Sequence, residues 1–581
     1  MNYTKSYIKD YPRPSLVRNS FLLLNGLWDF RFDEDNSGLK SNWNQGFKKE
    51  YDIKVPFSYL TVESQINIQK RVDVIWYQRI FSKNSNLNHL LHLEGSDDYT
   101  MVWVNGIFIG DHRGGYDRIS FDISHALKQE DNLIVIRVED DFRTDKPRGK
   151  QRWKPENFGC WYHETTGIWK TVWIEFVDLF YLRNVLFTTN LDQRLLTVDY
   201  ELNQLKHDLS IEIYVEFNHQ EVSYIEQKIT RQKDKITFSI QTEDDQFKIK
   251  TWSSDNPNLY DVKIIIKDKE KVYDQVLSYF GVTKWRSIQK GIYLNDQPTY
   301  LKMLLDQGYW PESGLTPSSE EDIIKDILLT KEMGFNGIRK HQKIEDDRFY
   351  YFCDLLGLYV WLEMPSAYEF NQMMMERVTH EWLSILKSHL NFPSIMTYVL
   401  FNESWGVPSI INSKDQQDFT VGLYYLTKAI DPSRFIISND GWEHTKSDLI
   451  TIHNYLPYQI DLEKAYHDMD KILKNEYVKE AKARLLFAEG YTYQNQPILI
   501  SEYGGVAFES KSGWGYGDQV KTNEEFINRL SGLTQAIFEM KDVSGYCLTQ
   551  TTDVEQEVNG LLYPNRNPKI DIKLIQKMNK K

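Results

Sequence analysis

Apolar and polar residues alternate in short runs along roughly the first 182 residues. Such runs occupy residues 26–32, 101–104 and 132–138. Alternation with a period of two is typical of strands that bury one face. Asn105-Gly106 separates two of these runs, and this dipeptide predicts a tight β-hairpin turn. Many short strands with turn signals between them favour a jelly-roll β-sandwich for residues 1–182.

A second β-rich segment covers residues 183–281. Its alternating runs lie at residues 197–202, 209–215 and 235–240. About 100 residues with this pattern fit one immunoglobulin-like β-sandwich. The charged stretch 227–235 predicts a solvent-exposed hairpin within this sandwich.

From residue 282 onward, apolar runs are separated by helical patterns. The clearest helix is predicted for residues 320–333, where Ile323 and Ile327 lie at helical spacing and Gly334 ends the pattern. Eight strands are predicted, at residues 300–306, 337–341, 359–365, 396–403, 435–440, 449–455, 498–502 and 544–550. Eight strands alternating with helices over about 300 residues predict a (β/α)₈ TIM barrel for residues 282–581.

Two of the apolar runs end in a glutamate. Residues 395–400 lead to Glu403, and residues 498–501 lead to Glu502. Runs this apolar are typical of parallel strands buried on both faces, and the C-terminal ends of such strands carry the active site of a barrel. Two carboxylates across the mouth of a barrel suit glycoside hydrolysis. The alternative is that both glutamates form ordinary structural salt bridges.

Composition excludes several other classes of function. The chain has 581 residues and a net charge of −14, which argues against nucleic acid or an anionic membrane as a partner. No apolar run approaches the length of a membrane-spanning helix, and the N-terminal residues lack the apolar core of a secretory signal. Three cysteines are too few and too scattered for a disulfide framework or a zinc site. We therefore expect a cytoplasmic, reduced protein.

The aromatic content of 14%, with 16 tryptophans, suits contacts with sugar rings and equally suits the cores of β-sandwiches.

The order of two sandwiches and a barrel, together with four short motifs, resembles glycoside hydrolase family 2. This family includes β-galactosidases, β-glucuronidases and β-mannosidases. The motifs are residues 166–169 (TGIW), 336–341 (NGIRKH), 401–404 (FNES) and 500–505 (ISEYGG). The resemblance covers nearly the whole chain. It implies a carbohydrate substrate and allows a homo-oligomer, since relatives are often dimers or tetramers.

The resemblance also implies roles for particular residues. Glu403 would be the general acid/base and Glu502 the nucleophile of a retaining mechanism, with Arg339 keeping Glu502 ionised. Asn402 lies beside Glu403 in the sequence and is predicted to bind the sugar 2-hydroxyl. Tyr455, at the end of the sixth strand, would hydrogen-bond the nucleophile.

Other polar or aromatic residues at predicted strand ends are candidate substrate contacts, each with a structural role as the alternative. They are His341, His453, Asp306 and Trp442, together with Gln307, Glu363 and Asp440. The acidic residues Asp553, Glu555 and Glu557 follow the last strand and would either border the substrate or form a solvated loop.

Two departures from the family bear on the substrate. Residues 305–311 lack the acidic, His-containing segment that long bacterial β-galactosidases use for metal binding, so we expect no metal and no cofactor. β-Glucuronidases bind the sugar carboxylate with an Asn-x-Lys pair after the eighth strand. In this chain the sequence of residues 555–560 is EQEVNG instead. Acidic residues would repel a carboxylate, which favours a neutral sugar, with a β-galactoside first. A β-glucuronidase is the alternative specificity, and a catalytically inactive carbohydrate-binding protein is the alternative class.

Overall fold

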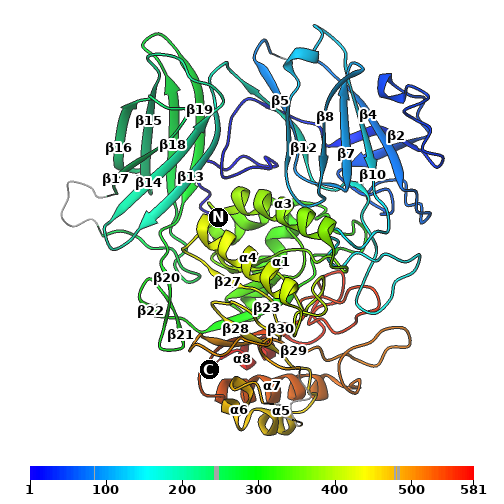
Figure 1. The fold of residues 1–581 in the computed structure, drawn as a ribbon, viewed down its shortest axis with the longest axis vertical. Coiled ribbons are helices and arrows are strands. Elements are labelled where there is room, and N and C mark those ends of the chain that lie inside the picture. Colours follow the sequence, from blue (N-terminus) through cyan, green and yellow to red (C-terminus); the bar gives the residue numbers. More distant parts are fainter. Residues whose placement is uncertain (84, 241–247, 477–478, 480–483, 581) are drawn as a thin grey trace.

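The computed structural model describes residues 1–580 except 84, 241–247, 477–478 and 480–483. Figure 1 shows two β-sandwiches side by side, with the barrel below both of them and helix α3 facing the gap between them. The predicted class is confirmed: an N-terminal sandwich, an immunoglobulin-like sandwich and a TIM barrel. No helix among the described residues is long and apolar enough to span a membrane.

The N-terminal sandwich consists of two main sheets and a two-stranded ladder. Their strand orders are β1-β12-β5-β9, β3-β2-β4-β10-β7-β8 and β11-β6. The strands are β1 (Phe21–Leu23), β2 (Gly26–Phe32), β3 (Tyr51–Val55), β4 (Val74–Phe81), β5 (Asn88–Leu93), β6 (Ser96–Asp97), β7 (Tyr99–Val104), β8 (Ile107–Arg113), β9 (Ile119–Asp122), β10 (Asn132–Glu139), β11 (Gly167–Ile168) and β12 (Val172–Val177). The predicted hairpin turn is present between β7 and β8, where Asn105 and Gly106 have φ of 53° and 81°.

The middle sandwich packs sheet β13-β14-β17 against sheet β16-β15-β18-β19 around one apolar core. Its strands are β13 (Leu182–Asn190), β14 (Leu195–Leu202), β15 (Ser210–Phe217), β16 (Gln220–Lys228), β17 (Lys233–Ser239), β18 (Tyr260–Lys267) and β19 (Val272–Phe280). The hairpin predicted for residues 227–235 is wrong. β16 and β17 belong to opposite sheets, so the chain crosses between sheets there instead of turning back on itself.

The barrel is one parallel sheet in the order β27-β26-β25-β24-β23-β30-β29-β28. Its strands are β23 (Leu301–Asp306), β24 (Gly337–Lys340), β25 (Tyr359–Glu363), β26 (Ile395–Val399), β27 (Phe435–Ile437), β28 (Ile450–His453), β29 (Ile498–Gly504) and β30 (Val543–Thr549). All eight predicted strands are present. Among the described residues β27 and β28 form no ladder, so the barrel is nearly closed. A small antiparallel sheet precedes it: β20 (Trp285–Ile288), β21 (Gly291–Leu294) and β22 (Gln297–Pro298).

Helices cover the outside of the barrel. They are α1 (Glu320–Glu332), α2 (Asp347–Leu356), α3 (Gln372–His389), α4 (Lys414–Ile430), α5 (Gln459–Tyr466), α6 (Met469–Leu473), α7 (Asn523–Glu539) and α8 (Ile572–Met578). The helix predicted for residues 320–333 is confirmed as α1. Its first turn is capped by Ser319, whose side chain accepts a hydrogen bond from the Asp322 backbone, and Gly334 follows it at φ 88°.

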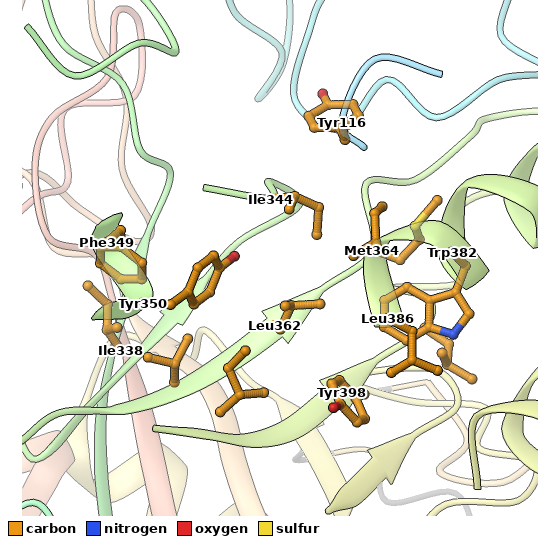
Figure 2. Close-up of a cluster of buried hydrophobic side chains, with 14 of the residues drawn as sticks. Tyr116, Ile338, Ile344, Phe349, Tyr350, Leu362, Met364, Trp382, Leu386 and Tyr398 are labelled. Atoms are coloured by element: carbon orange, nitrogen blue, oxygen red, sulfur yellow. The ribbon is translucent and has the colours of Figure 1, made fainter. Parts of the chain in front are cut away.

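Side chains on the barrel strands alternate between two environments. Leu301, Met303 and Leu305 of β23 pack inside the barrel, whereas Leu304 packs outside under the helices. Figure 2 shows part of the outer core, in which Leu362 and Tyr398 of the barrel meet Trp382 of α3. Tyr116 of the N-terminal sandwich belongs to the same cluster.

Polar contacts also tie the three parts together. The Tyr116 backbone donates a hydrogen bond to Glu381 of α3 over 2.8 Å. Arg18 forms buried ion pairs with Glu175 of β12 at 2.6 Å and with Asp274 of β19 at 2.8 Å, which joins the two sandwiches. The N-terminal sandwich is thereby fixed against the barrel, so its loops hold defined positions near the strand ends.

Candidate active site

Glu403 and Glu502 lie together at the C-terminal ends of the barrel strands. Glu403 sits four residues beyond β26, whose end was predicted at residue 403 and lies at Val399. An isolated bridge between Asn402 and Asp440 carries the pairing past the strand, and Glu403 then turns with φ 52°. Carboxylate oxygens of Glu403 and Glu502 lie within 4.8 Å of each other. The two side chains are 18% and 7% exposed, so both reach solvent.

Arg339 is the centre of the charge network beneath them. It points into the barrel from β24 and is fully buried. Its guanidinium donates to Glu363 at 2.6 Å, to Glu502 at 3.0 Å and to the Asn402 side-chain oxygen at 2.6 Å, and it pairs with Asp440 at 2.5 Å. The predicted contact between Arg339 and Glu502 is therefore present.

His453 connects the two glutamates. Its Nδ1 lies 2.8 Å from Glu403 and its Nε2 lies 2.9 Å from Asp440 and 3.5 Å from Glu502. Burial alone would lower the pKa of His453, but the carboxylates of Glu502 and Asp440 raise it to about 10. The imidazole is therefore a cation at neutral pH, with both nitrogens donating to carboxylates.

Tyr455 contacts Glu502 from the side opposite Arg339. Its hydroxyl donates to Glu502 Oε2 over 2.5 Å, while Arg339 occupies Oε1. The Tyr455 ring stacks on Tyr516 with centroids 3.4 Å apart. Burial and the nearby Glu502 hold the pKa of Tyr455 well above its usual range, so the phenol keeps its proton.

Trp442 and His341 border the same cluster. The Trp442 ring lies 5.5 Å from that of His453, and its indole N–H is buried without a hydrogen-bond partner among the described residues. His341 Nδ1 lies 3.0 Å from Glu363. Burial, together with Arg339, lowers the pKa of His341, so this ring is neutral.

Gln307 donates to the Gln550 side chain over 2.8 Å, and no hydrogen bond among the described residues joins it to the cluster. The structure does not bring Asp306 to the cluster either. Its neighbour Leu305 points into the barrel, so the side chain of Asp306 points outward. There its carboxylate binds Lys340 Nζ over 2.5 Å, and both residues are buried. This placement gives no support to a role for Asp306 in substrate binding.

Two residues that were only general candidates hold the network in place. Glu363 and Asp440 both bind Arg339, and Asp440 also binds His453. Burial would raise the pKa of Asp440, but Arg339 and His453 hold it well below its usual range. The carboxylates of Glu363 and Asp440 therefore bind the side chains that contact Glu403 and Glu502, and among the described residues no hydrogen bond joins them to these two glutamates themselves.

Sequence reasoning missed the contribution of the N-terminal sandwich. Its loop of residues 148–164 lies against the loop after β30: Tyr162 OH donates to Glu557, and Gln556 donates to the Trp161 carbonyl over 3.0 Å. Trp161 also packs on Trp405, two residues beyond Glu403, with ring centroids 5.4 Å apart. The density of aromatic residues at 153–162 was the one available signal.

Three side chains of this cluster have the spacing of metal ligands. Ligand-type atoms of Glu403, His453 and Glu502 all lie within 4.8 Å of one another. A histidine that donates from both nitrogens has no lone pair for a metal, so an ion could bind here only if His453 lost a proton. That the protein needs no metal stays a prediction.

Three family models match successive parts of the chain. Residues 21–172 match the sugar-binding domain of glycosyl hydrolases family 2, and residues 288–581 match the family's TIM barrel domain. Residues 180–282, between them, match a model described simply as glycosyl hydrolases family 2.

Individual relatives have low sequence identity to this chain. A β-galactosidase of Thermoanaerobacterium thermosulfurigenes is 26% identical over 84% of this chain and 65% of its own length. A putative β-glucuronidase of Formosa agariphila is 28% identical over 66% of this chain and 46% of its own. The chain thus spans about half to two thirds of the length of these curated relatives. The crystal structure of Ruminococcus gnavus β-glucuronidase superposes over 100% of both chains with a TM-score of 0.78 at 18% identity, which shows a shared fold. The family models and the architecture together establish that the chain belongs to glycosyl hydrolase family 2.

Proposed function

We propose that the protein is a retaining exo-β-glycosidase that removes a terminal β-linked sugar by double displacement. The observation that carries this proposal is the separation of the two carboxylates, whose oxygens approach within 4.8 Å. Retaining enzymes hold their carboxyl groups roughly 5–5.5 Å apart, whereas inverting enzymes leave about 6.5–9.5 Å for a water molecule. The short separation supports a covalent intermediate on one glutamate.

Glu502 is the better nucleophile of the two. Arg339 and Tyr455 donate to its two oxygens, so the carboxylate is stabilised and held in one orientation. Glu403 is the more exposed carboxylate and accepts from His453 at Oε1, which leaves Oε2 to carry the proton for the leaving group. In the second step the same carboxylate would take a proton from the attacking water.

Asn402 would bind the sugar. Arg339 donates to its side-chain oxygen over 2.6 Å, which fixes the amide with its NH₂ group turned the other way. That group would donate to the sugar 2-hydroxyl beside Glu502. Trp442 and the neutral His341 offer further contacts for hydroxyl groups and ring faces.

A neutral sugar, with a β-galactoside first, remains our proposal for the specificity. Glu557 is buried at the end of the barrel facing the N-terminal loop, where a sugar carboxylate would meet a second anion. A β-glucuronide is the second candidate, because curated relatives carry both names.

Nitrophenol release from a panel of nitrophenyl β-glycosides tests the proposal. The panel would contain galactoside, glucoside, mannoside, fucoside, arabinoside and glucuronide. We expect turnover of at least one neutral glycoside, with proton NMR showing the β-anomer as the first product. Turnover of none would support an inactive carbohydrate-binding protein, and an initial α-anomer would mean inversion.

A further inference from the structure

Lys150, from the N-terminal sandwich, places a buried positive charge beside the catalytic glutamates. The residue is 6% exposed, and its ammonium lies 5.0 Å from the centre of the Trp405 ring and 5.9 Å from that of Tyr162. Trp405 follows Glu403 by two residues, so the two domains meet at this side chain.

The ammonium of Lys150 differs from those of most buried lysines in this protein, although buried Lys170 likewise binds no carboxylate among the described residues and donates to the backbone carbonyl of Glu345. Lys146, Lys340 and Lys343 each bind a carboxylate oxygen at 2.5–2.7 Å. Across the described residues, no carboxylate oxygen lies within the 4.0 Å ion-pair limit of Lys150. The near partner of the ammonium is the Cys160 side chain. Burying a cation without an anion in direct contact costs free energy, which a ligand oxygen at that position would recover.

Glu557 supplies the opposite charge from the loop after β30. It is 3% exposed, and it accepts hydrogen bonds from Tyr162 OH and from the Asn559 side chain, the latter over 3.2 Å. Asn559 is itself held by Gln550 over 2.6 Å. A carboxylate has about four acceptor positions, so Glu557 can still accept from a ligand.

Lys150 and Glu557 also act on each other electrostatically. Burial would lower the pKa of Lys150, but the Cys160 thiol and Glu557 raise it. Burial raises the pKa of Glu557, and Lys150 opposes that rise. The charge of Glu502 acts on both groups, so both lie within the field of the proposed nucleophile.

We propose that Lys150 and Glu557 form a charge-balanced pair, built from two domains, that binds hydroxyl groups of a neutral terminal sugar and disfavours uronic acids. Lys150 would donate to one sugar oxygen and Glu557 would accept from a hydroxyl. A sugar carboxylate would instead add an anion beside Glu557 and Glu502, because the charge of Lys150 is already offset by that of Glu557. This inference rests on the glycosidase activity proposed above.

Matched substrates that differ only at C6 provide the test. They are the nitrophenyl β-glucoside and β-glucuronide, and the β-galactoside and β-galacturonide. The measured quantity is the ratio of kcat/KM for the uronide to kcat/KM for the neutral sugar. Glu557→Gln frees the cation while keeping the shape, so the ratio should rise by about tenfold or more. Lys150→Met leaves Glu557 unbalanced and removes a donor, so the ratio should fall and KM for the neutral sugar should rise.

The double variant Lys150→Met/Glu557→Gln separates charge balance from lost contacts. It restores neutrality, so its ratio should return to within about threefold of the wild type even though overall activity falls. Lys154→Met and Glu555→Gln are controls from the same two loops. Lys154 and Glu555 are both exposed, and the Glu555 carboxylate accepts a hydrogen bond from Asn157. Both should leave the ratio unchanged within about twofold.

The outcomes distinguish this inference from the function on which it rests. Turnover of no glycoside by the wild type would overturn the proposed activity and the inference with it. Turnover with a ratio that stays fixed in Glu557→Gln, or a wild type that prefers the uronide, would overturn the inference alone. Melting temperatures identify any variant that fails to fold. In that case the other single variant still gives the sign of the change.

Discussion

Two buried charge clusters start from neighbouring residues of β24 and have different properties. Arg339 points into the barrel and meets Glu363, Asp440 and Glu502. Lys340 points outward and pairs with Asp306 at 2.5 Å and Glu345 at 3.0 Å. Both clusters are buried, but only the inner one ends in side chains that reach solvent, at Glu403 and Glu502.

Access of the last side chains to solvent therefore distinguishes a chemical site from a structural ion pair better than the burial of the charges does. In the outer cluster Glu345 also pairs with Lys343, and no member of that cluster is more than slightly exposed. In the inner cluster the two carboxylates of Glu403 and Glu502 reach solvent. They accept hydrogen bonds from Arg339, His453 and Tyr455. A substitution in the inner cluster should change activity, and one in the outer cluster should change stability.

The largest expected effect is that of Glu502→Gln. Removing the proposed nucleophile would remove the covalent route, so kcat should fall by about four or more powers of ten. The melting temperature should stay within a few degrees, because the amide oxygen can still accept from Arg339 while the NH₂ group donates to the Tyr455 hydroxyl. Steady-state turnover and thermal unfolding measure the two effects. Activity within about tenfold of the wild type would remove Glu502 from the nucleophile role.

Glu403→Ala should show a smaller loss that depends on the leaving group. A dinitrophenyl glycoside hardly needs a proton, so the variant should still glycosylate Glu502 and then stall, which gives a burst followed by slow turnover. Alkyl glycosides should lose about two to four powers of ten. Azide needs no general base and should speed the second step by forming a β-glycosyl azide. Equal losses on both substrates without azide rescue would instead indicate a salt-bridge residue.

The sequence was sufficient to predict the strands but not the direction of every side chain at their ends. The buried strands are apolar on both faces, so the pattern does not reveal which residues point inward. Arg339 and Asp306 therefore looked equivalent, yet one binds Glu502 and the other binds Lys340. The family resemblance, rather than periodicity, separated Arg339 from the other candidates.

Contacts between domains were beyond the sequence for a different reason. Lys150 and Glu557 are about 400 positions apart, and each lies in a polar loop that resembles an ordinary solvated segment. Their proximity follows from the packing of the N-terminal sandwich on the barrel, where Tyr162 reaches Glu557. No local pattern encodes that packing, so the residues 148–164 could not be placed at the site in advance.

Asp306→Asn tests the outer cluster. Among the described residues, loss of this charge leaves Lys340 with Glu345 as its one remaining ion-pair partner, so stability should fall by about 3–5 kcal/mol. The value of kcat/KM should stay within about threefold of the wild type, in contrast to Glu502→Gln. Urea unfolding and turnover at a temperature well below the transition give both quantities. A large loss of kcat/KM in a stable variant would return Asp306 to the substrate contacts.

The smallest expected effect is the pH dependence of stability that His453 contributes. Its pKa in the folded protein is about 10, above the value of about 6.5 for an unfolded chain. The stabilisation is therefore complete below about pH 6.5 and is lost as the pH rises through 10. The melting temperature of His453→Gln should lie several degrees below that of the wild type, and this gap should narrow from pH 6.5 to 10.

His444→Gln is the matched control, since burial lowers the pKa of His444 to about 4 and the ring is neutral throughout this range. Its gap should stay constant, because other groups titrating near pH 10 are shared by both variants and cancel. A constant gap for His453→Gln as well would mean that His453 is neutral, and the hydrogen bonds to Glu403 and Asp440 could not both be donated by the imidazole.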